Sequence, residues 1–252
     1  MTISAITPKG QVLSFDPILR PVMALKSGST RGSALDRVMR EDGEEKPAGS
    51  GLGRLSSYDI EQVDRGVLND GLVQAKALHG EGRSPLLFLP AAFCTLSAPR
   101  ARREVLEMAL DAQRRLNARV VLEITHLDPG LPPTRLMEMV GLVRPVFSVV
   151  FARIKVERRA IAAVTGCALA GAAVEAVHIV DPEDEELLTR VRLVLAAVGP
   201  RMLLHNLRTT AALNAAHGAG ISYATLDLAH MSAGAANWPT NESGGEVSPA
   251  AA

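Results

Sequence analysis

The chain has 252 residues, of which 47% are hydrophobic and 21% charged, a composition typical of globular proteins and not of disordered ones. Lysine plus arginine number 27, as do aspartate plus glutamate, and this balance argues against a protein that binds nucleic acid through excess positive charge. Two cysteines exclude a disulfide scaffold. Because the sequence shows neither a signal-like start nor an apolar run long enough to cross a bilayer, we expect a cytoplasmic protein without a membrane span.

Short apolar runs alternate along the chain with segments of helical spacing. Runs rich in leucine and β-branched residues predict strands over 12–19, 86–90, 120–125, 147–154, 173–180, 202–206 and 223–228, with a further strand at 32–38. Helical periodicity predicts helices over 60–78, 102–116, 134–142, 157–164, 184–198 and 209–217. In the first of these, Val63, Val67 and Val73 lie near one predicted buried face. Strands separated by helices predict a parallel sheet, because parallel neighbours need a crossover connection.

Two stretches differ from this pattern. Residues 40–54 are charged and rich in Gly, Pro and Ser, which predicts a flexible exposed loop. Residues 231–252 have a similar composition, with Trp238 as their one large apolar side chain, and we expect a disordered tail. The remaining residues, 1–230, are expected to form one domain.

The predicted strands favour a closed β/α barrel over an open sheet. Glu123 lies in the middle of the apolar strand 120–125. Alternation along this strand sends Val120, Leu122 and Ile124 to the helices, and Val121, Glu123 and Thr125 to the barrel interior. A buried carboxylate needs a partner or a metal ion, and barrels place such groups near their mouth.

Four segments align in order with one family. They are 15–18 (Phe-Asp-Pro-Ile), 33–37 (Ser-Ala-Leu-Asp-Arg), 63–68 (Val-Asp-Arg-Gly-Val-Leu) and 122–126 (Leu-Glu-Ile-Thr-His). Over residues 11–228 the sequence resembles the EAL domain, a bacterial barrel whose active members hydrolyse the second messenger cyclic di-GMP. The resemblance implies an EAL-type (β/α)8 TIM-like barrel, an α/β fold in which divalent metal ions at the strand ends activate the attacking water.

Several positions depart from the family pattern. By the resemblance, Ser33 replaces the signature Glu, Pro90 replaces an Asn ligand, His126 replaces a second Glu, and Ala152 and Arg153 occupy the place of an Asp pair. The strand segment 173–176 (Ala-Val-Glu-Ala) stands where Lys-x-Asp is expected. Among the family-site positions, only the one occupied by Glu123 still has the metal-ligating residue of the family. Because one carboxylate cannot hold two hard cations, we expect no phosphodiesterase activity and no bound metal or other cofactor.

Two arginines are candidates for an interaction with Glu123. In the family, the arginine at the position of Arg37 helps to hold the nucleotide phosphate, whereas Arg153 stands at a former metal-ligand position. A guanidinium there can replace a cation, so we favour an ion pair between Glu123 and Arg37 or Arg153. The alternative is that Arg37, Glu123 and Arg153 bind a ligand.

Histidines follow several predicted strands at their carboxyl ends. Glu123 could form a transition-metal site with three of them, His178, His205 and His230, whereas we favour unrelated polar caps. We therefore expect a catalytically inactive domain that acts in bacterial signalling through contacts with an unidentified protein, and by resemblance a homodimer. The alternatives are a receptor that binds cyclic di-GMP without hydrolysis and a hydrolase with a histidine-rich metal site.

Overall fold

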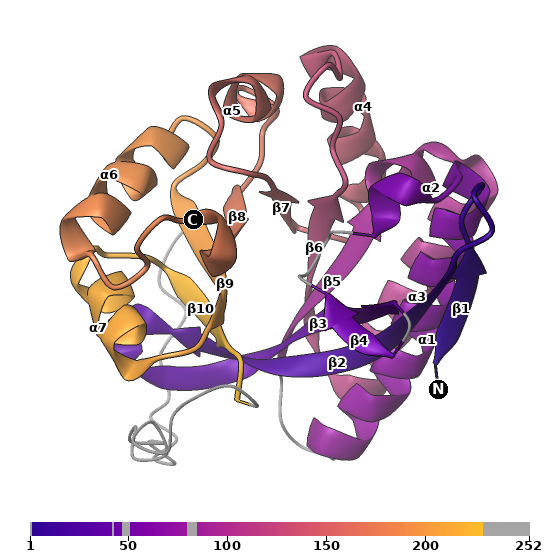
Figure 1. The fold of residues 1–252 in the computed structure, drawn as a ribbon, viewed down its shortest axis with the longest axis horizontal. Helices are drawn as coiled ribbons and strands as arrows, with labels where there is room; N and C mark the ends of the chain where they lie inside the picture. The colour runs from indigo at the N-terminus through magenta and orange to yellow at the C-terminus, as the bar shows by residue number, and fades with distance from the viewer. Residues whose placement is uncertain (1, 42, 47–50, 80–84, 229–252) are drawn as a thin grey trace.

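A computed structural model describes residues 2–41, 43–46, 51–79 and 85–228. In this part of the chain, eight strands close a barrel (Figure 1). The order around the barrel is β3, β5, β6, β7, β8, β9, β10 and β2, and β2 pairs with β3 to close it. Their bounds are β2 (Val12–Ala24), β3 (Ser29–Glu41), β5 (Leu86–Ala92), β6 (Arg119–Thr125), β7 (Val149–Arg153), β8 (Gly171–Glu175), β9 (Arg201–Leu207) and β10 (Tyr223–Leu226).

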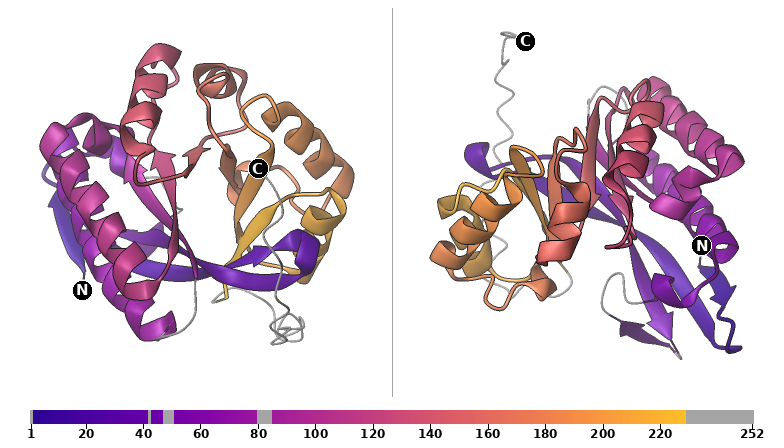
Figure 2. Two further views of the ribbon diagram at one scale, coloured as in Figure 1. Left: turned by 180° about the vertical axis from the view of Figure 1, so that it is seen from behind. Right: turned by 90° about the horizontal axis from the view of Figure 1, so that it is seen from above.

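Helices surround the barrel on the outside, with α1 and α3 beside β1 and β5 and with α6 and α7 on the opposite side (Figures 1 and 2). The predicted helices are confirmed as α1 (Ser57–His79), α3 (Pro99–Leu116), α4 (Pro133–Val143), α5 (Arg158–Val164), α6 (Glu185–Leu195) and α7 (Thr210–Gly218). The additional short elements are β1 (Ile3–Ile6), β4 (Glu44–Lys46), α2 (Phe93–Ser97), η1 (Leu25–Ser27), η2 (Leu52–Arg54) and η3 (Ala176–His178). Two expectations are wrong in detail: the strand expected over 173–180 ends at Glu175 and continues as η3, and Val73 is 66% exposed.

One barrel strand does not follow the predicted parallel arrangement. β2 pairs antiparallel with both β3 and β10, whereas the pairs from β3 through β5 to β10 are parallel. The connection from β2 to β3 consists only of η1 and Gly28, which adopts a left-handed conformation with φ of 62°. Such a tight turn reverses the chain, because a parallel partner would need a much longer crossover.

The barrel interior contains an apolar layer near the amino ends of its parallel strands. Phe88 packs edge-to-face against Phe151 and Tyr223, with ring centroids 5.7 and 5.8 Å apart. Val22, Ala34, Val121, Ala173 and Leu203 complete this layer. On β6, Val120, Leu122 and Ile124 pack in the outer core against the helices. The predicted inward orientation of Val121, and hence of Glu123, is confirmed.

The expectation of a flexible loop over residues 40–54 is wrong for the described residues of this stretch, which include β4 and η2. Glu41 ends β3, and β4 pairs antiparallel with it through Met39, Arg40 and Glu41. Leu52 in η2 is 3% exposed and belongs to the outer core. The composition concealed this short hairpin because backbone hydrogen bonds, and not apolar side chains, hold β4 in place. The expected tail at 231–252, with Trp238, and His230 lie outside the described residues.

Candidate functional site

Above the apolar layer lies a second interior layer, made of charged and polar side chains. Side chains two residues apart on a strand share a face, and on five of the parallel strands the interior apolar residue is followed by an interior polar one at the carboxyl end, whereas on β5 Phe88 is followed by Pro90. Thus Ala34 is followed by Asp36, Val121 by Glu123, Phe151 by Arg153, Ala173 by Glu175 and Leu203 by His205. The carboxyl end of the strands is the face on which β/α barrels carry their functional sites.

Three carboxylates surround the guanidinium of Arg153. Nε of Arg153 donates to Glu123, and Nη1 donates to Glu175 at 2.8 Å and to Asp36 at 3.3 Å. The side chains of the three acids are at most 4% exposed, and that of Arg153 is 14% exposed. We call Arg153, Asp36, Glu123 and Glu175, with His205 and Asn206 described below, the Arg153 cluster.

His205 is fully buried and joins Glu123 to the next strand. Its Nε2 lies 3.0 and 3.1 Å from the two carboxylate oxygens of Glu123, and its Nδ1 lies 3.3 Å from Oγ1 of Thr225 on β10. Both ring nitrogens are therefore engaged by protein groups. A metal ion could bind His205 only by displacing one of these partners.

Asn206 joins the cluster although strand alternation would send it to the opposite face from His205. It adopts a left-handed backbone conformation with φ of 62°, and the register between β9 and β10 shifts at this level. As a result, Nδ2 of Asn206 donates to Glu175 at 2.7 Å and to Asp36 at 3.4 Å. An irregularity of this kind redirects a side chain, and it occurs often beside functional sites.

The cluster shifts the pKa values of Glu123, Asp36 and Arg153. Burial raises the pKa of Glu123, but Arg153 and, when protonated, His205 outweigh that effect and hold the pKa at about 2. Burial also raises the pKa of Asp36, and Arg153, His205 and Arg20 lower it below its ordinary range. Burial lowers the pKa of Arg153, whereas the three carboxylates raise it well above its ordinary value. The carboxylates and the guanidinium thus stabilise one another in their charged forms.

This mutual stabilisation predicts an acid-sensitive fold. Because the pKa of Glu123 falls from 4.5 to about 2 on folding, its contribution to stability is present above about pH 4.5 and is lost as the pH falls towards 2. Urea unfolding followed by circular dichroism at a series of pH values should show this decline. Glu123→Gln should lower the stability at neutral pH and make the acid limb shallower; an unchanged acid limb in this variant would assign the effect to other carboxylates.

A second buried ion pair connects the barrel to α1. Asp64 on α1, 1% exposed, accepts hydrogen bonds from Arg37, from the backbone nitrogen of Ala92 at 2.7 Å and from Oγ1 of Thr95 at 2.6 Å. Nη2 of Arg37 also donates to Oγ1 of Thr125 at 3.0 Å. Arg37 is therefore held by protein groups on two sides, which fixes α1 to the carboxyl ends of β3, β5 and β6.

Arg20 extends the charged layer on the side of β2. Its Nη1 donates to Asp227 at 2.8 Å, and its Nε lies 3.4 Å from Asp36. Asp227 also accepts from Arg208 at 3.2 Å, and the Arg208 side chain is 60% exposed. A chain of alternating charges therefore runs from the Arg153 cluster to the outer edge of the barrel mouth.

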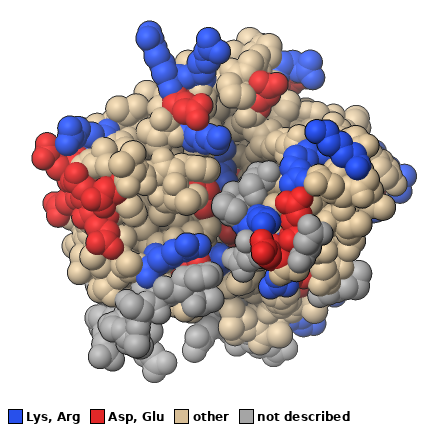
Figure 3. All heavy atoms as spheres, in the orientation of Figure 1, with Lys and Arg blue, Asp and Glu red and all other residues tan. Residues whose placement is uncertain are grey.

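Two pockets open at this mouth, and Asp36, Arg37 and Glu175 line both of them. The larger, of about 490 Å³, extends over β9, β10 and the start of α7. The smaller, of about 320 Å³, extends over the ends of β6 and β7 and includes Arg153 and His126. Basic and acidic side chains both occur around the central hollow of this face (Figure 3). Nη2 of Arg153 and Oδ1 of Asn206 are buried and have no hydrogen-bond partner among the described residues.

The structure separates the family-site positions into two groups. Pro90 pairs in register with Glu123 and lies in the interior layer, and Arg153 and Glu123 are in contact. Ser33 and Ala152 instead lie on the opposite face of their strands, since Ala34 belongs to the interior layer and Ala152 packs in the outer core. The predicted Glu123–Arg153 ion pair is thus present, whereas Arg37 pairs with Asp64.

The histidines considered for a metal site are not gathered together. His205 contacts Glu123, but His178 is exposed at the rim of the smaller pocket, and His230 is outside the described residues. His126 lines the same pocket through a left-handed conformation with φ of 56°; burial, and then Arg37, lower its pKa. Within the described residues, no group of three or more His, Cys, Asp or Glu side chains is arranged to hold a metal ion.

Sequence reasoning did not place Asp36, Glu175 and Asn206 in the cluster with Glu123. Glu123 is therefore not an isolated acid, because Arg153 joins it to Asp36 and Glu175. For Asp36 and Glu175 a signal was present, because each lies two residues beyond a small interior residue, Ala34 or Ala173. Asn206 carried no such signal, since its position depends on a local backbone irregularity.

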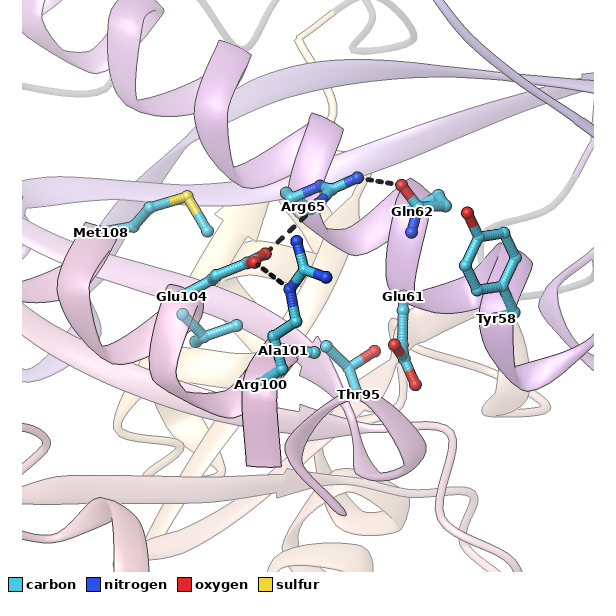
Figure 4. Close-up of a pocket in the computed structure, with 10 residues that line it drawn as sticks. Tyr58, Glu61, Gln62, Arg65, Thr95, Arg100, Ala101, Glu104 and Met108 are labelled. Carbon is cyan, nitrogen blue, oxygen red and sulfur yellow. Dashed lines mark hydrogen bonds and ion pairs between the residues drawn. The ribbon is translucent and has the colours of Figure 1, made fainter. Parts of the chain in front are cut away.

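A third pocket, of about 180 Å³, lies outside the barrel between α1, α2 and α3 (Figure 4). Its two arginines, Arg65 and Arg100, share Glu104 at 3.4 and 3.2 Å. The hydroxyl of Thr95 lines the pocket and donates to Asp64. The charges of this pocket are thus largely satisfied by one another, and it does not reach the Arg153 cluster.

The comparisons with known proteins agree with this architecture. No family model matches the sequence, and no curated protein matches it. Among solved structures, the chain is similar to the Xanthomonas citri FimX EAL domain in complex with cyclic di-GMP, with a TM-score of 0.59, 12% identity, and coverage of 85% of this chain and 86% of that one.

Two further structures show the same likeness. A Bacillus subtilis protein with an EAL domain, YkuI, in complex with substrate cyclic di-GMP and calcium, gives a TM-score of 0.60 at 14% identity over 83% of this chain and 53% of that one. The phosphodiesterase PaMucR in its cyclic di-GMP complex gives 0.61 at 8% identity over 84% and 93%. The chain therefore has the EAL-type barrel fold, as the resemblance implied. No helix among the described residues combines the length and apolar character that a bilayer crossing requires.

Proposed function

We propose that this chain is a catalytically inactive EAL-type barrel that acts in bacterial signalling through contacts with a partner protein. The observation that carries the proposal is the Arg153 cluster: the guanidinium of Arg153 contacts and neutralises Asp36, Glu123 and Glu175. The three EAL-domain structures compared above are complexes with cyclic di-GMP, and one of them also contains calcium. A guanidinium cannot lower the pKa of a bound water as a divalent metal ion does.

The residues that would have to hold divalent ions here fit that role poorly. Hard cations require several oxygen ligands that converge on one point. In this barrel, Glu123 is committed to Arg153 and His205, Glu175 to Arg153 and Asn206, and Pro90 beside Glu123 offers no side-chain oxygen. We therefore derive no hydrolytic step for this site.

The outer surface supports contact with a protein. A shallow groove of about 600 Å³ between α5 and α6 is lined by the apolar residues Val156, Ile161, Ala162 and Val194 and by Arg158 and Thr165. Val194 is 52% exposed, and its neighbour Leu193 is 59% exposed. Exposed apolar residues that gather beside a groove mark interaction surfaces more often than isolated ones do. A homodimer through this face is part of the proposal.

The test of catalytic inactivity uses the purified full chain. Incubation with cyclic di-GMP and either magnesium or manganese, followed by chromatography, should yield no linear dinucleotide, while a known phosphodiesterase run in parallel does. Circular dichroism on the same sample shows that the protein is folded. Turnover that disappears in Glu123→Gln would overturn the proposal.

A second candidate function is a receptor that binds cyclic di-GMP without hydrolysing it. Two pockets at the mouth and the unpaired polar atoms Arg153 Nη2 and Asn206 Oδ1 favour it, because a ligand could supply the missing partners. Isothermal titration should then show binding that weakens in Asn206→Ala. Absence of heat at high ligand concentration would leave the protein-contact function alone.

A further inference from the structure

The pocket between α1, α2 and α3 has the faces of two helices as its walls (Figure 4). Residues three or four apart on a helix share one face, and the lining residues follow this spacing from Tyr58 to Arg65 on α1 and from Arg100 to Met108 on α3. Thr95 of α2, which is 1% exposed, also lines the pocket. No residue of this pocket lines either of the two pockets at the barrel mouth.

The charges of this pocket are divided between two sides. On one side, the guanidinium groups of Arg65 and Arg100 share the single carboxylate of Glu104. Arg100 donates to Glu104 through Nε, and its two terminal nitrogens donate to no other group among the described residues. Glu61 lies on the other side (Figure 4), and within the described part of the chain it forms no hydrogen bond and no ion pair. The pocket therefore has a positive side and a negative side.

The negative side is suited to a group that donates several hydrogen bonds. The hydroxyl of Thr95 donates its one proton to Asp64 at 2.6 Å, so its oxygen can only accept a hydrogen bond from an occupant of the pocket. Glu61 lies three residues before Asp64 on α1, and its carboxylate is likewise an acceptor. Tyr58 lies one turn before Glu61 and adds an aromatic ring, which attracts cations. An ammonium group, with three donors and a positive charge, matches these three residues.

The positive side and the size of the pocket complete the description of the ligand. The Arg100 side chain is 89% exposed, so its guanidinium is free to turn towards a carboxylate and bind both oxygens. Ala101, Met108 and the buried Val105 supply apolar surface between the two sides. The volume of about 180 Å³ is below the range of about 300–1,000 Å³ that drug-sized ligands occupy, which excludes a nucleotide.

We propose that this pocket binds a free α-amino acid with an apolar side chain. The carboxylate of the amino acid pairs with Arg100, and its ammonium group pairs with Glu61 and donates to Thr95. Its side chain packs against Val105 and Met108. The proposal does not depend on whether the mouth of the barrel binds cyclic di-GMP, because the two places share no lining residue.

Isothermal titration of the purified full chain with L-leucine and with L-methionine tests the proposal. Both amino acids should bind, with one molecule per chain. N-acetyl-L-methionine lacks the ammonium group and L-methioninamide lacks the carboxylate. Each derivative should bind about tenfold more weakly than L-methionine, as expected when a hydrogen-bonded charge is lost.

Two variants assign the binding to this pocket. Glu61→Gln and Arg100→Gln should each weaken the binding of L-methionine by about tenfold, while circular dichroism shows that the fold is kept. The matched controls are Glu107→Gln and Arg103→Gln, at exposed positions of α3 outside the pocket, and they should leave the affinity unchanged. Three outcomes would overturn the proposal: no heat with either amino acid at millimolar concentration, derivatives that bind as well as L-methionine, or unchanged binding in Glu61→Gln and Arg100→Gln.

Discussion

Replacing Arg153 by alanine is expected to lower the free energy of unfolding by about 3–5 kcal/mol, the range found when one partner of a buried ion pair is removed. The substitution leaves Asp36, Glu123 and Glu175 in a buried layer without the charge that neutralises them. The pKa values of Asp36 and Glu123 should rise as a result, because burial then acts on them without the opposing positive charge. Chemical denaturation at neutral pH measures the loss. Arg159→Ala, at an exposed position on α5, is the matched control and should change stability little.

The same variant distinguishes a cation substitute from an ordinary structural ion pair. If Arg153 occupies the place of a positive ion among oxygen ligands, then manganese or calcium should raise the melting temperature of Arg153→Ala and leave the original chain unaffected. Magnesium should act less, because it gives up its water ligands reluctantly. A variant that is as stable as the original chain, or equally indifferent to all divalent ions, would contradict this role for Arg153.

Replacing Asp64 by alanine is expected to have an effect of similar size, about 3–5 kcal/mol, on the other side of the mouth. Asp64 accepts three hydrogen bonds, and its loss leaves Arg37, 7% exposed, without its carboxylate partner. The variant should also loosen α1 from the barrel. Amide hydrogen exchange should therefore increase in α1 and around Ala92 more than in α6 and α7.

Two further substitutions make the Asp64 result specific. Glu61→Ala removes a partly exposed carboxylate from the same helix. It should lower the free energy of unfolding far less than Asp64→Ala does, because water replaces the interactions of Glu61. Asp64→Asn keeps the shape and some hydrogen bonds but removes the charge. Its loss of unfolding free energy should lie between those of Asp64→Ala and Glu61→Ala. If Asp64→Ala and Glu61→Ala were equally mild, the ion pair with Arg37 would not be a determinant of stability.

The two buried ion-pair networks explain how acidic side chains are kept in the interior at the mouth of this barrel. The first places acids at the carboxyl ends of the strands and the second places Asp64 on α1 beside them, and each acid group is met by an arginine from the barrel sheet, Arg153 on β7 and Arg37 on β3. Unpaired carboxylates in that layer would repel one another and lower stability. The arginines allow the polar layer to persist without an external cation, which is consistent with the proposed inactivity.

Much of the fold follows from local sequence pattern. The apolar runs and the helical periodicity locate the barrel strands and the main helices, and the alternation in β6 predicts the inward orientation of Glu123. These features depend on residues close together in the chain, so a short window contains the required information. The same alternation, applied to β3 and β8, indicates Asp36 and Glu175 as interior residues once Ala34 and Ala173 are known to face inwards.

The composition and the pattern of the chain thus determined a barrel with a buried acid near its mouth. They also showed that most metal-ligand positions of the family carry other residues in this chain. Only the tertiary structure decided which groups surround that acid, because Arg153 and His205 contact Glu123 across separations of 30 and 82 residues, and Arg153 reaches Asp36 across 117 residues. It also decided the direction of β2, which a short turn reverses, and the inward position of Asn206, which a left-handed residue creates. Such choices are fixed by closure of the whole sheet, and local propensity does not encode them.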